Sequence, residues 1–395
     1  MNESLPIVID VSAIPVQPGG VGTYARELLR CLPAAGIEPV VLTRRNDERV
    51  WDGVHRTLRL VPSARPLRLA WEQILLTSAT SRSLGDAILP KVLHSPHYTM
   101  PRLVGRRWRP ARVVTIHDLT FFTRPQDHSR SKVVLFRHAI ERAVRESDAT
   151  IAVSHATAEQ LERFLPKGSP VHVIPHGIDH DRFHPCTGKG DETSDLEILA
   201  PLGIPESYIL HLGTIEPRKN VAGLLKAYEE VIRRWHRSDE PPALVLAGGA
   251  WPGTWEHLER TATDIGNRFP QARVIRCGTV GDEALAPLYR RAGAVLYPSF
   301  EEGFGLPFLE ALACGALVVT SKQTVMHSIA GDAAISVDPS DPLSIAQGIE
   351  VALEEFGGPR IQGFLNRSAL AIAVAAPYRW SRTAQAHADV YRSLC

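Results

Sequence analysis

Residues 294–314 read AVLYPSFEEGFGLPFLEALAC, and the rest of the fold can be worked out from this stretch. Its first four residues form a short apolar run of the kind that is buried in a parallel sheet. Two glycines and Pro307 follow, and proline is favoured in a first helical turn because its φ angle is fixed and it carries no backbone N–H. The stretch therefore predicts a strand at 294–297, a turn, and a helix at 307–314.

The same alternation of apolar runs and amphipathic stretches recurs along the chain, which is typical of β-α-β units and parallel sheets. In the first half, strands are expected at residues 6–10, 39–43, 91–94, 113–117, 150–153 and 171–174. In the second half, strands are expected at residues 208–212, 243–247, 273–276, 294–297 and 317–320. The helices expected between them include 24–32, 133–146, 221–235, 255–269 and 283–291. The chain is thus predicted to be an α/β protein.

Between the two series, residues 184–200 lose the periodic pattern and are rich in Pro, Gly, Thr, Ser and mixed charges, as in a linker. We therefore predict two doubly wound, Rossmann-like domains over residues 1–185 and 186–378. A last helix over 379–395 could pack back on the first domain. Open parallel sheets bind ligands at the carboxyl ends of their strands, so two such sheets facing a central cleft would form one site between the domains.

Length and composition exclude several classes of protein. The 395 residues are 44% hydrophobic and 22% charged, which is the balance of a globular chain of two or three domains. We find neither an apolar run of about 18 residues nor a signal-peptide pattern before the first strand. The five cysteines are scattered and form no C-x-x-C pair, which argues against a disulfide framework and a zinc ribbon. We expect a cytoplasmic protein.

The net charge of +1 conceals an asymmetry between the two halves of the chain. Residues 1–185 contain 25 Lys and Arg against 18 Asp and Glu, whereas residues 186–395 contain 19 against 25. Eleven of the basic residues lie between Arg102 and Arg145, interleaved with four aromatic residues. Such a region can face an anionic substrate or a membrane surface, but it can equally be an ordinary solvated face.

Two adjacent cations follow the strand expected over 208–212, where the next helix begins. Arg218 offers forked donors and Lys219 a point charge, and together they suit a diphosphate. Glu302 and Glu310 place one carboxylate in a loop and the other in a first helical turn, so they can hold two hydroxylated parts of one ligand. The glycine amides between them would meet phosphate oxygens. A solvated helix start and a capping arrangement without function are the alternatives.

Two features of the first half could also take part in chemistry. The loop Gly19-Gly20-Val21-Gly22 opens a helix at Thr23, so its amides could approach an anion, although it is not a full dinucleotide or P-loop motif and could be a plain turn. His117 ends an apolar strand, and we expect it to project into the cleft. His94 and His97 also follow a strand and could equally be structural. We find no metal-ligand cluster and no activated Ser or Cys nucleophile.

Taken together, these segments resemble glycosyltransferase family 4, the retaining enzymes of GT-B fold, and within it the bacterial mannosyl- and rhamnosyl-type transferases of polysaccharide assembly. The resemblance runs nearly from end to end. It implies a C-terminal domain that holds a sugar nucleotide and an N-terminal domain that holds the acceptor. The motifs that carry it are GVGTY (20–24), TIHD (115–118), AVS (152–154), VIPHGID (173–179), residues 213–220 and EGFGLP (302–307) with Glu310.

The resemblance also implies roles for individual residues. Arg218 and Lys219 would neutralise the donor diphosphate, Glu302 would hold the donor sugar, and Glu310 would bind the ribose. The residues expected to act in catalysis are His117, Arg218, Lys219 and Glu302. The residues expected to contact the donor are Gly20, Gly22, Gly213, Thr214, Val280, Gly303, Phe304, Gly305, Leu306 and Glu310.

The implied activity is transfer of a hexose or 6-deoxyhexose, of mannose or rhamnose type, from a nucleotide diphosphate sugar, with GDP favoured and without a metal ion or other cofactor. The resemblance implies that the acceptor is a lipid-linked glycan. The reaction would belong to cell-surface polysaccharide synthesis, such as that of lipopolysaccharide. The cytoplasmic protein could then associate peripherally with the inner face of the membrane, and no nucleic-acid partner is expected. The alternatives are a sugar-nucleotide 2-epimerase on the same fold and a non-catalytic sugar-nucleotide-binding protein.

Overall fold

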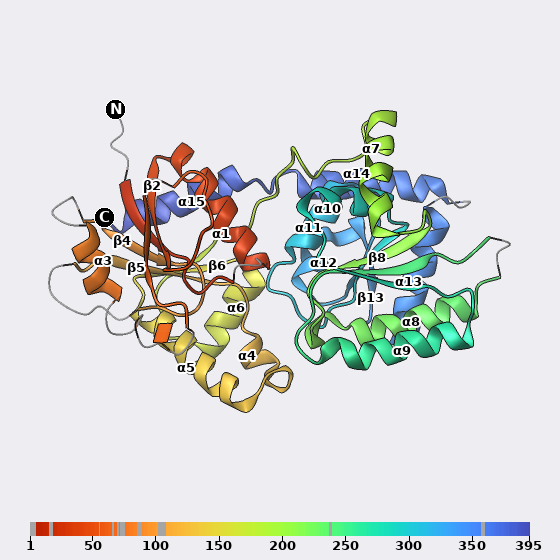
Figure 1. The fold of residues 1–395 in the computed structure, drawn as a ribbon, viewed down its shortest axis with the longest axis horizontal. Coiled ribbons are helices and arrows are strands. Elements are labelled where there is room, and N and C mark those ends of the chain that lie inside the picture. The colour runs from red at the N-terminus through yellow and green to blue at the C-terminus, as the bar shows by residue number, and fades with distance from the viewer. Residues whose placement is uncertain are drawn as a thin grey trace. The chain divides into compact units, whose positions relative to one another are not determined.

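The computed structural model describes residues 5–15, 19–54, 56–64, 67–68, 71, 76–84, 89–101, 108–236, 239–356 and 360–395. The chain divides into two compact units, Met1–Gly177 with Tyr378–Cys395, and Ile178–Pro377 (Figure 1). The first division falls after Gly177 rather than after residue 185. Each unit contains one parallel sheet covered by helices, so the predicted fold class, α/β with two doubly wound domains, is confirmed.

The sheet of the first unit has seven parallel strands in the order β3-β2-β1-β4-β5-β6-β7. Its strands are β1 (Leu5–Asp10), β2 (Ile37–Arg44), β3 (Arg56–Val61), β4 (Val92–Ser95), β5 (Ala111–Ile116), β6 (Ala149–Ala152) and β7 (Val171–Val173). The sequence did not predict β3. This strand lies at the edge of the sheet and only Leu58 and Val61 of its six residues are buried, so it lacks the continuous apolar run of a central strand.

Helices cover the first sheet because each has one apolar face to bury. For example, Ile140 of α5 and Leu161 of α6 pack in one cluster with Val114 of β5. The last helix, α15, comes from the far end of the chain and packs against α1 (Figure 1). The helices of this unit within the described residues are α1 (Gly20–Cys31), α3 (Leu76–Leu84), α4 (Thr120–Thr123), α5 (Arg130–Glu146), α6 (His155–Phe164) and α15 (Trp380–Ser393).

The sheet of the second unit has six parallel strands in the order β10-β9-β8-β11-β12-β13. Its strands are β8 (Tyr208–Leu212), β9 (Ala243–Ala247), β10 (Val274–Gly278), β11 (Ala294–Tyr297), β12 (Val318–Ser321) and β13 (Ala334–Val337). Strands β8, β9 and β11 have the predicted bounds. The edge strand β13 was not predicted, because a serine interrupts its apolar run and only its first and last residues are buried, whereas all four residues of the equally short β11 are buried.

Helices lie on both sides of the second sheet, with α8 and α9 along one side and α10 and α11 on the other (Figure 1). Helix α8 also packs against α13, and α11 against α14. The helices of this unit within the described residues are α7 (Lys189–Leu199), α8 (Val221–Arg233), α9 (Thr254–Arg268), α10 (Asp282–Arg291), α11 (Leu306–Ala313), α12 (Val325–Ala330), α13 (Pro342–Glu355) and α14 (Ile361–Ala375).

The prediction of a linker over residues 184–200 was wrong, because α7 occupies most of it. Two acidic residues in the first turn of this helix, Asp191 and Glu192, suit the positive end of its dipole. Asp195 is 1% exposed and accepts a hydrogen bond of 2.8 Å from Nε of Arg290 in α10. Helix α7 is thus held by a tertiary ion pair, and its polar sequence shows no apolar periodicity from which it could be predicted.

In each unit the first three strands extend the sheet in one direction from the first strand. The next strand pairs with the other side of that first strand, and the remaining strands extend the sheet in the opposite direction. This reversal falls between β1 and β4 in the first unit and between β8 and β11 in the second. Ligands of open α/β sheets bind at such switch points, beyond the carboxyl ends of the strands. In the described residues, no helix combines the length and hydropathy that crossing a bilayer requires.

Candidate functional site

Hydrogen bonds join two loops at the switch point of the second unit. The loop after β8 and the loop after β11 are linked by the backbone N–H of Phe300, which donates to the carbonyl of Arg218 at 2.8 Å. The side-chain amide of Asn220 donates to the carbonyl of Pro298 at 3.1 Å. Asn220 has a φ of 59° and accepts a hydrogen bond from the N–H of Gly223 at 3.3 Å, so it also caps α8. These contacts fix the two loops relative to each other.

The two loops bring Arg218, Lys219 and Glu302 into direct contact. Arg218 donates from Nη1 to Oε2 of Glu302 at 2.6 Å, and its Nη2 lies 2.7 Å from Oε1 of Glu216. The ammonium group of Lys219 and the hydroxyl of Ser299 both donate to the other oxygen of Glu302. Lys219 and Glu302 are each 8% exposed. Three of the four predicted catalytic residues therefore lie in one buried ionic cluster.

The cluster keeps Glu302 ionised. Burial opposes the charge on this carboxyl group, but the charges and hydrogen bonds of Arg218 and Lys219 outweigh burial and lower its pKa to about 2. Glu216, for which no role was predicted, is 7% exposed and pairs with Arg218. The only feature of the sequence that could have indicated this pairing is the position of Glu216, two residues before Arg218. The two cations are thus balanced by two carboxylates before any ligand binds.

A glycine stands at the carboxyl end of each of three neighbouring strands in this unit. Gly213, Gly248 and Gly278 stand at the ends of β8, β9 and β10, and the N–H of Gly213 donates to the carbonyl of Ala247 at 2.9 Å. Gly248 has a φ of 128°, and a Cβ atom there would lie 2.2 Å from the carbonyl oxygen of Gly213. Only glycine fits at this position. Gly248 was not predicted as a site residue, although the pair Gly248-Gly249 directly follows an apolar strand in the sequence.

The other predicted donor contacts of this unit follow the same strand ends. Thr214 is next to Gly213, and Val280 lies between β10 and α10. Because the carboxyl ends of parallel strands share one edge of a sheet, these residues and the loop after β11 lie along that edge. The structure does not bring Thr214 or Val280 into a hydrogen bond with the ionic cluster among the described contacts, and their roles stay predictions.

The loop before α11 is anchored by buried side chains. Phe304 is 5% and Leu306 6% exposed, and they flank Gly305, whose φ is 89°. A Cβ atom on Gly305 would lie 2.8 Å from Cγ of Met326, so the left-handed backbone and the close packing both require glycine. The backbone of Gly303 to Gly305 therefore leads directly into the N-terminus of α11.

The position of Glu310 differs from the prediction. Helix α11 begins at Leu306, one residue earlier than expected, because the loop's left-handed glycine caps it. Glu310 is its fifth residue and so lies just beyond the first turn. It is 7% exposed, and Oε2 accepts a hydrogen bond of 3.0 Å from the hydroxyl of Tyr289 in α10. This contact with Tyr289 was not predicted.

The predicted glycine loop of the first unit is helical. Helix α1 begins at Gly20, so Gly20 and Gly22 form its first turn and do not precede it. The N–H groups of Gly22 and Thr23 both donate to the carbonyl of Gly19, at 2.8 and 3.1 Å. The first amides of a helix have no partner within it, and here these belong to Gly20 and Val21. Helix N-termini of this kind suit an anion, and the assignment of Gly20 and Gly22 to the donor stays a prediction.

His117 follows β5 and is held by a backbone contact. Its Nε2 donates to the carbonyl of Pro96 at 2.9 Å, and the residue is 8% exposed. Burial lowers the pKa of this imidazole, although the bond to Pro96 and the charge of Asp118 oppose the shift. Because a carbonyl can only accept, the proton of the neutral ring is on Nε2, and Nδ1 is left as an acceptor. The ring of Tyr24 meets that of His117 edge-on, with centroids 4.9 Å apart.

An oriented chain of hydrogen bonds ties α15 to the first sheet. Nδ1 of His387 donates to a backbone carbonyl one turn earlier in α15 at 2.7 Å, so its Nε2 accepts from the hydroxyl of Tyr24 at 2.8 Å. Tyr24 in turn accepts from Thr115 at 2.9 Å, and Thr115 accepts from Nε2 of His94 at 2.8 Å. The hydroxyl of Tyr391 donates to Nδ1 of His94 at 2.8 Å. Each ring is neutral and has one defined tautomer in this arrangement.

We predict that acid destabilises the first unit through its buried histidines. Burial is the largest cause that lowers the pKa of these groups, to about 3 for His97 and about 4 for His387, so the unfolded chain binds protons below about pH 6.5 that the native state does not. Stability is therefore complete above pH 6.5 and falls toward pH 4, by up to about 1.4 kcal/mol per pH unit for each histidine. The histidines concerned are His94, His97, His117, His176 and His387.

Urea unfolding at pH 7.5, 6.5 and 5.5 measures this loss. A His387→Gln variant, in which an amide that does not titrate replaces one ring, should show a shallower dependence on pH. A free energy of unfolding that stays constant between pH 7.5 and 5.5 would contradict the prediction.

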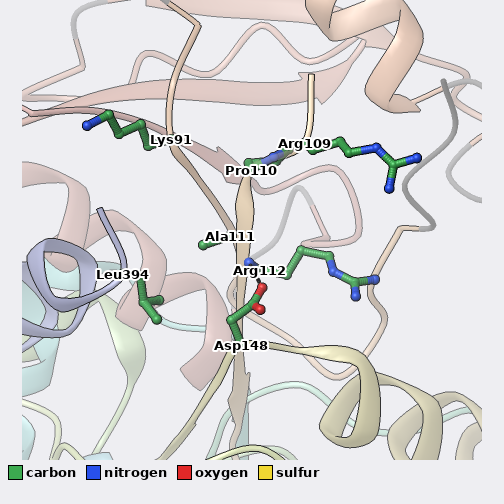
Figure 2. Close-up of a pocket in the computed structure, with 7 residues that line it drawn as sticks. All are labelled: Lys91, Arg109, Pro110, Ala111, Arg112, Asp148 and Leu394. Atoms are coloured by element: carbon green, nitrogen blue, oxygen red, sulfur yellow. Dashed lines mark hydrogen bonds between the residues drawn. The ribbon is translucent and has the colours of Figure 1, made fainter. Parts of the chain in front are cut away.

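A separate cavity of about 490 Å³ lies at the opposite edge of the first sheet, where β4, β5 and β6 begin (Figure 2). The side chain of Lys91 points away from those of Arg109 and Arg112 there, so the three cations do not converge on one ligand position (Figure 2). The backbone N–H of Arg112 donates to Oδ2 of Asp148 at 2.7 Å. The lining residues are Lys91, Arg109, Pro110, Ala111, Arg112, Asp148 and Leu394. None of the predicted site residues lines this cavity.

Much of the basic region 102–145 is engaged within the protein. Residues 102–107 lie outside the described residues. Arg112 approaches Glu146 at 3.4 Å, Arg124 pairs with Asp127 at 2.6 Å, and Arg137 donates to the carbonyl of Phe121 at 2.8 Å. These three arginines hold loops and helix ends in place, whereas Arg130 and Lys132 of the same region are exposed on α5.

The fold and the site together define a class of protein. The structure is similar over 99% of both chains to sucrose-phosphate synthase from Thermosynechococcus elongatus, with a TM-score of 0.73 at 21% identity. It is also similar to Anabaena HepE in complex with UDP and glucose, with a TM-score of 0.71 at 18% identity over 98% of this chain and 100% of that one. The structure therefore has the GT-B fold, as the resemblance implied.

Family models identify both units. Residues 18–182 match the model of Glycosyltransferase Family 4, and residues 197–357 match that of Glycosyl transferases group 1. The chain is 29% identical to the O-antigen chain mannosyltransferase B of Escherichia coli, over 99% of this chain and all of the relative. The chain belongs to glycosyltransferase family 4.

Proposed function

We propose that the protein transfers a hexosyl or 6-deoxyhexosyl group, of mannose or rhamnose type, from a nucleotide diphosphate sugar to a glycan acceptor with retention at the anomeric carbon. The observation that carries the proposal is the contact of Arg218 and Lys219 with Glu302 at the switch point of the second unit. The mannosyltransferase name of the Escherichia coli relative supports the sugar. GDP is the nucleotide favoured by the resemblance to that branch of the family.

The ionic cluster would work by exchange of partners. A bound diphosphate draws Arg218 and Lys219 toward its oxygens, and the carboxylate of Glu302 is then released to accept hydrogen bonds from hydroxyl groups of the donor sugar. Negative charge develops on the diphosphate as its bond to the sugar breaks, and positioned cations stabilise that charge most. No metal ion is required for this role.

The transfer itself needs no nucleophile from the protein. The bond between the anomeric carbon and the phosphate oxygen breaks while the acceptor hydroxyl forms its bond on the same face. The proton of that hydroxyl passes to the departing phosphate oxygen, so charges and atoms balance. His117 would lie beside the reacting oxygens and offer Nδ1 as a hydrogen-bond acceptor.

The acceptor is proposed to be a lipid-linked glycan in cell-surface polysaccharide synthesis, reached by peripheral association with a membrane. Helix α5 supports this reading, because Val134 and Leu135 on it are 72% and 51% exposed. Arg130 and Lys132 are exposed on the same helix. Apolar side chains beside cations suit the surface of an anionic bilayer.

A thermal-shift screen tests the donor. We expect GDP and GDP-mannose or GDP-rhamnose to raise the melting temperature more than UDP, ADP or dTDP, because a ligand that binds only the native state stabilises it by about 2.7 kcal/mol at 100 times its Kd. A selective shift with UDP would overturn the GDP assignment and leave the transferase. No shift with any of the four nucleotides would overturn the donor site itself.

A further inference from the structure

Tyr289 is a buried tyrosine that contacts one of the residues predicted to bind the donor. It lies in α10 and is 0% exposed, and its hydroxyl donates to Oε2 of Glu310 in α11 at 3.0 Å. The two helices pack against each other on one side of the second sheet (Figure 1). No role has been assigned to Tyr289 so far, although its hydroxyl meets the carboxylate directly.

The proton of this hydrogen bond stays on Tyr289. Burial, the neighbouring hydroxyl of Tyr297 and the charge of Glu310 hold the pKa of Tyr289 well above its ordinary value. An ionised carboxylate can only accept, so the phenol is the donor and Glu310 the acceptor. Hydrogen bonds to a charged group are shorter and stronger than those between neutral groups. The contact can therefore hold the carboxylate in one orientation.

The side chain of Glu310 extends toward the start of its own helix. Side chains of an α-helix tilt toward the N-terminus, so Glu310 covers the turn that begins at Leu306, directly after the glycine loop. This end of α11 follows the carboxyl end of β11, where a ligand of the second sheet is expected. Glu310 is 7% exposed, so part of the residue is open to solvent there.

A glutamate needs such a contact if it is to recognise a ligand well. Its last side-chain torsion, which turns the plane of the carboxylate, has only broad preferences. Ordering a flexible side chain when a ligand binds lowers the affinity. The hydroxyl of Tyr289 orders Glu310 in the folded protein before any ligand arrives. This donor is itself held in place, because its ring is fully buried and its centroid lies 6.1 Å from that of Phe183.

We propose that Tyr289 is a positioning residue for the donor, whose hydroxyl holds the carboxylate of Glu310 in the orientation that accepts hydrogen bonds from the ribose hydroxyl groups of the nucleotide. This inference rests on the proposed function and on the ribose-binding role predicted for Glu310. Tyr289 acts through Glu310 and does not contact the ligand itself. Its effect is therefore confined to the part of the affinity that the ribose hydroxyl groups contribute.

Binding of GDP and of 2′,3′-dideoxy-GDP to the full chain, measured by isothermal titration calorimetry, tests the assignment. The unmodified protein should bind GDP at least about 12-fold more tightly, which corresponds to one hydrogen bond to a charged group. Tyr289→Phe, which removes only the hydroxyl, should lower this preference by about 2- to 12-fold, the cost of ordering one flexible side chain on binding. Its affinity for the dideoxy nucleotide should be unchanged.

Tyr208→Phe provides a matched control in the same unit. The hydroxyl of Tyr208 is also buried, and it donates at 2.9 Å to the carbonyl of Leu288, the residue before Tyr289 in α10. This variant removes a hydrogen bond to the same helix without touching Glu310, so it should keep the full preference for GDP. In a Glu310→Ala background there is no carboxylate to orient, and Tyr289→Phe should then have no further effect on the preference.

The outcomes separate the positioning role from a structural one. An undiminished preference for GDP in Tyr289→Phe would overturn the proposal. An equal loss of affinity for both nucleotides, or the same loss of preference in Tyr208→Phe, would assign Tyr289 to packing alone and overturn it too. Equal binding of the two nucleotides by the unmodified protein would overturn the inference and leave the nucleotide site in place. Binding of neither nucleotide by the unmodified protein would instead count against the proposed function on which the inference rests.

Discussion

Replacing Lys219 with methionine should lower kcat by about 10- to 150-fold, because the variant loses a charge-assisted hydrogen bond to the leaving diphosphate worth about 1.5–3 kcal/mol. Methionine retains most of the length and apolar volume of the lysine side chain, so packing changes little. Arg218 remains paired with Glu302 and Glu216, and the two loops remain joined. The release of nucleoside diphosphate from the donor identified by thermal shift measures kcat.

Two further variants make this result specific. Lys219→Arg retains the positive charge and should keep more activity than Lys219→Met. Lys226→Met removes an exposed lysine of α8 and should leave kcat unchanged. Equal kcat for Lys219→Met and the unmodified protein would rule out a role for Lys219 in stabilising the diphosphate.

Replacing Glu302 with glutamine should have two opposite effects. Without nucleotide, the free energy of unfolding falls by about 3 kcal/mol, because Arg218 and Lys219 lose a buried partner. With nucleotide, the two cations no longer compete for a carboxylate, so the affinity for the nucleoside diphosphate rises by at least about tenfold, because two like charges even about 12 Å apart repel by about 1.4 kcal/mol at an effective dielectric constant of about 20. The melting temperature should therefore start lower and rise further on addition of GDP than in the unmodified protein.

The same variant should lose turnover, since a neutral amide holds the donor sugar less well than the carboxylate of Glu302. Thermal shift with and without GDP, followed by the rate of sugar transfer, separates the effects on stability, binding and turnover. Glu256→Gln, an exposed substitution in α9, provides the control. A smaller nucleotide shift in Glu302→Gln than in the unmodified protein would contradict the exchange of partners.

Acid destabilises the ionic cluster around Glu302 at a lower pH than it destabilises the buried histidines of the first unit. The pKa of Glu302 lies below its ordinary value, so the stability that its ion pairs contribute is complete above about pH 4.5 and is lost as the pH falls toward 2. The histidine effect begins about two pH units higher. The first unit is therefore expected to unfold before the ionic cluster is protonated.

Local patterns were sufficient to predict the class of fold and most of its central elements. Strands such as β8, β9 and β11 are buried on both faces and appear as uninterrupted apolar runs, which a short window of sequence reveals. Short windows of sequence did not predict β3, which lies at a sheet edge. They also did not predict α7, whose position depends on the ion pair between Asp195 and Arg290. Elements stabilised by distant partners have no complete local signal.

The sequence by itself determined the two parallel sheets, the glycine turns and the presence of Arg218, Lys219 and Glu302 after strand ends, because periodicity and turn chemistry act over a few residues. Only the tertiary structure decided that Lys219 meets Glu302 across 83 positions and that Tyr24 meets His387 across 363. It likewise decided that Glu216 balances the cations. Strand order sets these contacts, and strand order depends on packing of the whole chain rather than on any single segment.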